Sequence, residues 1–192
     1  MAGVDSPMLH RSRSEGVRFL VGLTVGSVIG AAILALPVYL VGTMVRVLPK
    51  PASLAVFVVA CVALGVADLK RRTPHVWRQV PQSLWHKLSP GWLGVVWGTD
   101  LGLLFTTQKT TSLIWVALAA VMFLQPAAAV AVLPAIAMAA SLAVVLATVM
   151  PGAEDRARVR WSGPWVVKAR RGSGWIILLV AAAIAVQGWL VA

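Results

Sequence analysis

Two ionisable residues, Asp100 and Lys109, lie inside long apolar blocks of this chain, and the lysine is one of seven consecutive polar residues, 106 to 112. A charge placed near the centre of a membrane costs several kcal/mol, so such groups are usually paired or line a polar path. On a continuous helix these two residues would lie on opposite sides, whereas a break between them would allow pairing. The pattern predicts a polar path or gate whose candidate residues are Asp100, Thr106, Gln108, Lys109 and Thr110.

Two simpler interpretations stay open at this level. The polar run could form a loop in the outer headgroup region between two short helices. Asp100 could lie within two turns of the cytoplasmic boundary and extend its carboxylate to the interface.

Other kinds of chemistry find little support in the sequence. No two carboxylates are placed for acid/base work, and there is no phosphate-binding loop, dinucleotide fingerprint or nucleophile elbow. Cys61 is the single cysteine, and His10, His75 and His86 have no metal-ligand spacing. We therefore expect no enzyme activity, no cofactor and no metal.

Asp68 is predicted to pair with the cations that follow it, and Ser141, Thr148 and Gln187 are predicted to form interhelical hydrogen bonds.

The composition predicts an all-α integral membrane protein. Hydrophobic residues make up 59% of the 192 residues and charged residues 12%, against roughly 25% charged in soluble domains. The apolar residues form blocks at about 17–45, 52–69, 91–125, 127–150 and 174–192, with prolines near their edges. A bilayer core requires about 20 apolar helical residues, so these blocks predict about five transmembrane helices.

The net charge of +11 is distributed in a way that predicts orientation rather than nucleic-acid binding. Of the 17 Lys and Arg residues, 14 fall in three clusters beside apolar blocks: Arg11, Arg13 and Arg18; Lys70, Arg71, Arg72, Arg78 and Lys87; Arg156, Arg158, Arg160, Lys168, Arg170 and Arg171. Cationic loops remain on the cytoplasmic side. The prediction is a membrane protein with a flexible cytoplasmic tail (1–15), cytoplasmic loops at 70–90 and 151–173, and the C-terminus outside. Six tryptophans, at 77, 85, 92, 161, 165 and 175, would form an interfacial belt.

A glycine motif occurs twice within the single transmembrane domain predicted for residues 16–192. The segment from Gly22 to Gly30 aligns with that from Gly94 to Gly102 at an offset of 72 residues, as G-x-x-x-G-[ST]-x-[IL]-G. The motif predicts two repeats, at about 17–69 and 91–150, followed by a last helix at 174–192; the loop charges make the repeats parallel. Glycines four apart allow close helix packing, so Gly22, Gly26, Gly30, Gly94, Gly98 and Gly102 are candidate packing positions. Gly42, outside the motif, is expected to tolerate a large side chain better.

The two blocks that carry the motif are longer than a bilayer requires. At 1.5 Å per residue, blocks 17–45 and 91–125 would extend roughly 43 and 52 Å as helices, against a hydrocarbon core of about 30 Å. Each must tilt and protrude or be broken, and Pro37 and the polar run at 106–112 are the predicted breaks.

The two glycine-rich segments, each leading a helical repeat, resemble small bacterial membrane proteins of the CcdA and LysE type. The segment Arg78-Gln79-Val80-Pro81, followed by Gly98-Thr99, also resembles actinobacterial membrane proteins. The CcdA branch needs a cysteine in each repeat, so dithiol electron transfer is not expected here. The resemblance implies a small-solute permease of a bacterial inner membrane. The alternative is a non-transporting membrane subunit or assembly factor whose basic loops hold a partner or anionic lipid. Expected partners are the lipid bilayer and a second copy or another membrane subunit, with no nucleic acid.

Overall fold

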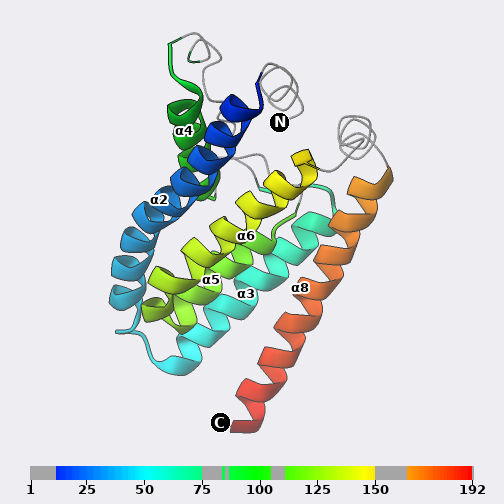
Figure 1. Ribbon diagram of the computed structural model, residues 1–192. Helices are drawn as coiled ribbons and strands as arrows, with labels where there is room; N and C mark the ends of the chain where they lie inside the picture. The colour runs from blue at the N-terminus through cyan, green and yellow to red at the C-terminus, as the bar shows by residue number, and fades with distance from the viewer. Residues whose placement is uncertain (1–11, 75–83, 85–86, 105–110, 150–163, 192) are drawn as a thin grey trace. The chain divides into compact units, whose positions relative to one another are not determined.

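Every regular element in the described part of the chain is a helix. The computed structural model describes residues 12–74, 84, 87–104, 111–149 and 164–191. In chain order the elements are α2 (Arg13–Val45), α3 (Lys50–Leu69), α4 (Pro90–Gly102), α5 (Leu113–Leu124), the short 3-10 helix η2 (Pro126–Ala128), α6 (Ala129–Val149) and α8 (Pro164–Val191) (Figure 1). Four helices of the described residues are long and apolar enough to cross a membrane, and α5 is a shorter apolar helix. The all-α membrane class is confirmed, while the count of about five spans stays a prediction.

Prolines mark the beginnings of several helices, as expected. Pro51 lies in the first turn of α3, Pro90 begins α4 and Pro126 begins η2. The first turn of a helix tolerates proline because its N–H groups have no partner within the helix.

The break predicted at Pro37 is wrong. Helix α2 continues through this proline for 33 residues, about 50 Å. Proline removes only one backbone hydrogen bond, and apolar residues on both sides favour the helix where hydrocarbon offers the backbone no other partner. The long first block is therefore one continuous helix.

The third block does divide, around the polar run. Helix α4 ends at Gly102 and α5 begins at Leu113. After α4, Leu104 adopts a φ of 60°, a left-handed conformation that residues with side chains rarely take, so the chain turns sharply there. With 13 and 12 residues, α4 and α5 extend about 20 and 18 Å, and neither alone covers a hydrocarbon core of about 30 Å.

Two helices begin earlier than the sequence predicted. Helix α2 begins at Arg13, inside the expected tail, after Ser12 accepts a backbone hydrogen bond from Gly16. Helix α8 begins at Pro164, so the cations of its first turns lie on a helix instead of in the predicted 151–173 loop. Lysine, arginine and alanine are good helix formers, which lets α8 extend past its apolar part.

The chain divides into two compact units. Unit 1 comprises Met1–Leu34, Trp77–Thr107 and Leu133–Gly163, and unit 2 comprises Ala35–Val76, Gln108–Val132 and Pro164–Ala192. In unit 1, helices α2 and α4 lie side by side (Figure 1). Leu133, Ala137 and Ser141 form one fully buried face of α6.

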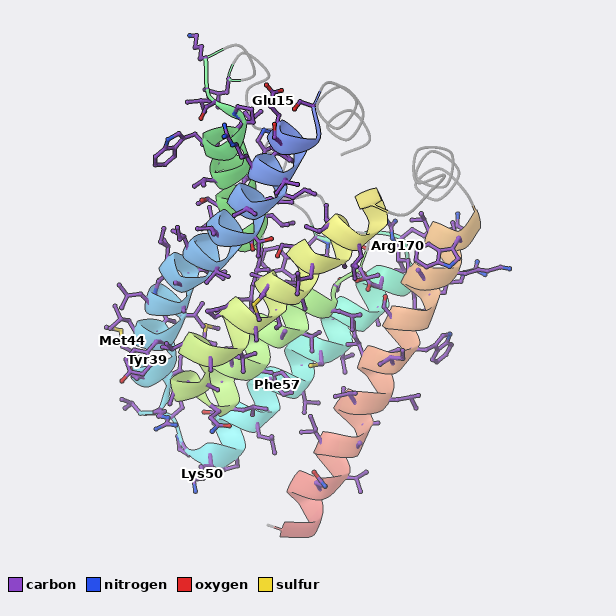
Figure 2. All side chains as sticks on the ribbon, in the orientation of Figure 1. Glu15, Tyr39, Met44, Lys50, Phe57 and Arg170 are labelled. Atoms are coloured by element: carbon purple, nitrogen blue, oxygen red, sulfur yellow. The ribbon has the colours of Figure 1, made fainter. Side chains whose placement is uncertain are left out.

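In unit 2, α3 packs against both α5 and α8. Its core consists of Phe57 and Cys61 from α3 with Ile177 and Ala181 from α8, and Figure 2 shows Phe57 on α3. The α5 residues Val116, Ala119, Ala120 and Phe123 pack on this core. Cys61 thus serves as a small buried hydrophobe.

Hydroxyl groups on the helices mostly bond within their own helix. Ser141 donates to the Met138 carbonyl oxygen at 2.9 Å, so its predicted interhelical bond is wrong. Gln187 is exposed, and the Thr148 side chain lies outside the described residues. A hydroxyl that bonds three or four residues back satisfies itself without a neighbouring helix.

Cys61 offers a first test of this core. Because the side chain is completely buried, we expect its thiol to resist a membrane-permeant maleimide in the folded protein and to react after denaturation. Cys61→Ala should lower the free energy of unfolding by only about 1 kcal/mol, since it removes one heavy atom. Maleimide labelling by mass spectrometry and a thermal unfolding curve measure both effects. Rapid labelling of the native protein would contradict the packing.

Candidate functional site

The six motif glycines all lie where α2 meets α4. A Cβ atom added at any of them would meet a carbonyl oxygen of the facing helix first, at less than contact distance. One at Gly26 would lie 2.8 Å from Val95 Cα, and one at Gly98 would lie 2.8 Å from the Leu23 carbonyl carbon. The two backbones therefore approach until glycine Cα–H groups face carbonyl oxygens, an arrangement only glycine permits.

The contacts of one strip reproduce those of the other at the 72-residue offset. Gly26 faces Val95, and Gly98 faces Leu23, which are the same two positions with the helices exchanged. The other motif glycines repeat this exchange. Gly22 faces Gly91 as Gly94 faces Phe19, and Gly30 faces Thr99 as Gly102 faces Ser27. Residue numbers rise together along both helices, so α2 and α4 run parallel.

The polar position of the motif is also used alike in both helices. Ser27 donates its hydroxyl to the Thr24 carbonyl oxygen at 2.8 Å, and Thr99 donates to that of Val95 at 2.9 Å. Both hydroxyls are satisfied within their own helix, so they do not hinder the close approach.

Most of the predicted path residues lie beyond the described part. Thr106, Gln108, Lys109 and Thr110 belong to the segment 105–110, outside the described residues. Asp100 lies on α4 in unit 1, partly buried, and takes part in an interaction. Its pairing with Lys109 stays a prediction.

A buried carboxylate in unit 2 is the centre of a polar cluster that the sequence did not reveal. Asp68, near the end of α3, is fully buried. Its Oδ1 accepts hydrogen bonds from the hydroxyls of Thr73 (2.8 Å) and Ser112 (2.7 Å). Its Oδ2 accepts from the Ser112 backbone N–H (2.8 Å) and from the Ser173 hydroxyl (2.8 Å). We call these four residues the Asp68 cluster.

The expected pairing of Asp68 with the neighbouring cations is therefore replaced by neutral donors among the described residues. Lys70, Arg71 and Arg72 are exposed, while the carboxylate points into the protein. A buried carboxylate requires several hydrogen bonds to offset its lost hydration, and four are present. Ser112 precedes α5, whose N-terminal dipole also favours a negative charge at this point.

The Asp68 cluster fixes three chain segments at one end of unit 2: the end of α3, the start of α5 and the early turns of α8. Further contacts join the same end. Arg170 donates to the Arg71 carbonyl oxygen at 3.3 Å, and Trp115 donates from its indole Nε1 to that of Pro74 at 3.0 Å. Figure 2 shows Arg170 at this end and Lys50 at the opposite end of α3.

Close backbone packing accompanies the cluster. A Cβ added at Gly65 would lie 3.1 Å from the Gly174 carbonyl oxygen, and one at Gly174 would lie 3.0 Å from that of Gly65. Helices α3 and α8 are antiparallel, because residues before Asp68 meet residues after Ser173. The usable sequence signal was one carboxylate and three hydroxyls, each at a point where an apolar stretch begins or ends: Asp68 and Thr73 near the end of block 52–69, Ser112 at the end of the polar run, and Ser173 just before block 174–192.

In the described part of the chain, no three His, Cys, Asp or Glu residues lie together as metal ligands. Comparison of the chain with protein-family models, with curated proteins and with solved structures gave no match.

Proposed function

We propose that the protein is a small-solute permease of a bacterial inner membrane, with its path around the segment that joins α4 to α5. The observation that supports this proposal is the position of Ser112. The Asp68 cluster holds Ser112, and with it the start of α5, beside the end of α3.

The two ends of segment 90–112 then belong to one side of the membrane. If α2 crosses and α3 crosses back after the turn at 46–49, the start of α2 and the end of α3 share a side. Helix α4 begins beside the start of α2, because Gly91 is nearest to the Arg18 carbonyl oxygen, 3.8 Å from an added Cβ. Ser112 lies at the end of α3. Segment 90–112 thus enters and leaves on the same side.

We infer that this segment is re-entrant. Helix α4 extends only about 20 Å into the membrane, and Ser112, held by Asp68, lies on the side from which α4 came. Non-helical backbone at membrane depth is tolerated only where protein surrounds it or where it lines a water-filled cavity. Broken helices are a common source of solute sites in transporters.

The cations at the end of α3 and at the start of α8 support a cytoplasmic position for this side. The end of α3 carries Lys70, Arg71 and Arg72, and the first turns of α8 carry Lys168 and Arg171. Under the positive-inside rule, α2, α3, α6 and α8 cross, the N-terminus is cytoplasmic and the C-terminus is outside. Helix α5 is shorter than the hydrocarbon core, but with Ser112 before it and Pro126 after it the chain leads from the end of α3 to Gly42 near the outer end of α2, so this segment also changes sides. The symmetric contacts of α2 and α4 support a duplicated ancestral helix. The resemblance to LysE-type permeases agrees with this function.

The candidate path residues retain their roles in this proposal. Lys109 would meet an anionic or polar solute, Gln108 and the threonine hydroxyls would replace the solute's hydration water, and Asp100 would balance the lysine charge.

Purified protein in liposomes should pass small polar solutes from a panel graded by size and charge, measured by stopped-flow light scattering. We expect Lys109→Ala and Gln108→Ala each to reduce this flux at least about fivefold, since each would remove a polar contact with the solute worth about 1–3 kcal/mol. Thr43→Ala, at an exposed hydrogen bond within α2, is the matched control.

The gathering of cations at one end of unit 2 favours a second function, that of a membrane subunit or assembly factor. The Arg170–Arg71 hydrogen bond joins two cationic clusters that are far apart in the sequence. The second function would replace the permease proposal under two results. Charge reversal at Arg156, Arg158 and Arg160 would release a co-purifying protein, and Lys109→Ala and Gln108→Ala would leave the solute flux unchanged.

A further inference from the structure

One side of α8 carries an exposed stripe of mixed chemistry. Its members follow each other at spacings of three and four residues: Trp165, Lys168, Gly172, Trp175 and Leu179, which we call the α8 stripe. The opposite side of the helix holds Ser173, Ile177 and Ala181, all buried. The stripe therefore faces away from unit 2's own core.

The stripe combines a cation, a bare backbone and apolar side chains in that order. Lys168 is exposed, and Arg171 is exposed beside it. A Cβ added at Gly172 would meet nothing within 4 Å, so the helix surface is open there. Towards the C-terminus, Trp175 and Leu179 are 61% and 67% exposed. A cationic end thus leads over an open backbone onto an apolar surface.

Other cations strengthen the positive end. The Arg170–Arg71 hydrogen bond holds the exposed Lys70, Arg71 and Arg72 beside the first turns of α8. Figure 2 shows Arg170 on α8. The carboxylate of Asp68 is enclosed by its hydroxyl donors and does not reach this surface. Among the residues that the structure describes, the local field at this surface is therefore set by cations.

We propose that the α8 stripe binds one anionic phospholipid. Lys168 and Arg171 hold the phosphate, the glycerol backbone lies over Gly172, and an acyl chain runs along Trp175 and Leu179. Basic residues beside a membrane helix attract anionic headgroups, and indole rings favour the headgroup level. A soluble phosphate would gain nothing from the apolar half of the stripe, so the occupant is a lipid. This binding does not depend on transport activity.

The test is thermal unfolding of the purified full chain in neutral detergent, titrated with dioleoyl phosphatidylglycerol. We expect this lipid to raise Tm at concentrations where dioleoyl phosphatidylcholine and inorganic phosphate do not. Each cation near an anionic surface contributes about a fivefold factor, so Lys168→Gln with Arg171→Gln should weaken the apparent affinity about 25-fold. Lys50→Gln, at the opposite end of α3, should change it little.

Gly172→Leu distinguishes a specific lipid-binding site from nonspecific attraction between the cations and anionic lipid. It adds a side chain where no protein atom lies within 4 Å, so the protein should fold normally while the open backbone is filled. We expect at least about a fivefold loss of phosphatidylglycerol affinity with the net charge unchanged, the effect of a lost contact of about 1 kcal/mol. Equal rises in Tm with both lipids would overturn the proposal. An unchanged phosphatidylglycerol affinity in Gly172→Leu would also overturn it. Release of a bound protein by Gly172→Leu, at unchanged lipid content, would overturn it in favour of a protein partner.

Discussion

Gly98→Ala should lower the free energy of unfolding by about 3 kcal/mol, and Gly26→Ala should have a similar effect. A single methyl group at either position would overlap the facing backbone. Besides the nearest carbonyl oxygen, further backbone atoms would lie only 2.8 Å from the added Cβ. Backbone atoms cannot rotate away as a side chain does, so α2 and α4 must separate, which places the cost at the upper end of that for overpacking. Thermal unfolding and the yield of monodisperse protein by size-exclusion chromatography measure this loss.

Gly91→Ala is the matched control in the same helix. Its added Cβ would find its nearest atom, the Arg18 carbonyl oxygen, at 3.8 Å, which is ordinary contact. We expect unchanged or slightly raised stability, because alanine favours a helix more than glycine by about 1 kcal/mol. Equal losses at Gly91 and Gly98 would mean that the close approach of the two helices has no special role.

Asp68→Ala should cost about 4 kcal/mol, because it leaves the donors of three other residues without their buried acceptor. Ser112→Ala and Ser173→Ala each remove one hydroxyl and should cost about 1 to 2 kcal/mol. Asp68→Asn should have an intermediate effect, because only one side-chain oxygen remains. If the amide N–H₂ takes the place of Oδ2, it faces the Ser112 N–H, a second donor. If it takes the place of Oδ1, the hydroxyls of Thr73 and Ser112 must turn to accept from it. Chemical unfolding of the purified variants gives this order.

Ser89→Ala is the control for the serine substitutions. Ser89 precedes α4, is exposed and makes no side-chain capping hydrogen bond. Its loss should be within about 0.5 kcal/mol of the parent, as for surface changes without a special contact. A series in which Ser89→Ala equals Ser112→Ala would contradict the Asp68 cluster.

The helical class and the glycine contacts could be read from the sequence because both depend on local patterns. Long apolar blocks specify helices in lipid, and glycines four apart create a flat strip on any helix. The polar run likewise predicted where the third block divides. Pro37 misled the prediction because one missing hydrogen bond does not end a helix that has apolar residues on both sides.

The Asp68 cluster could not be predicted, since its members are separated by up to 105 residues. Local charge suggested a pair with the next cations, but a carboxylate on the inward face of α3 meets whatever the packing brings there. The same applies to Gly42. It was expected to tolerate a side chain, yet an added Cβ would lie 2.7 Å from Pro126 Cγ and 2.9 Å from the Met122 carbonyl oxygen. Contacts between distant segments decide both cases.

If segment 90–112 is re-entrant, both of its ends lie on the same side of the membrane, and the sidedness of single cysteines measures this directly. Cysteines replace Val47, Ser89 and Thr111, one at a time, in a Cys61→Ala background, and intact cells and inside-out vesicles are treated with an impermeant thiol reagent. Val47, 89% exposed in the turn after α2, should react from outside. Ser89 and Thr111 should both react only from the cytoplasmic side. Labelling of Thr111→Cys from the side that labels Val47→Cys would show that α4 crosses the membrane and would contradict the re-entrant segment.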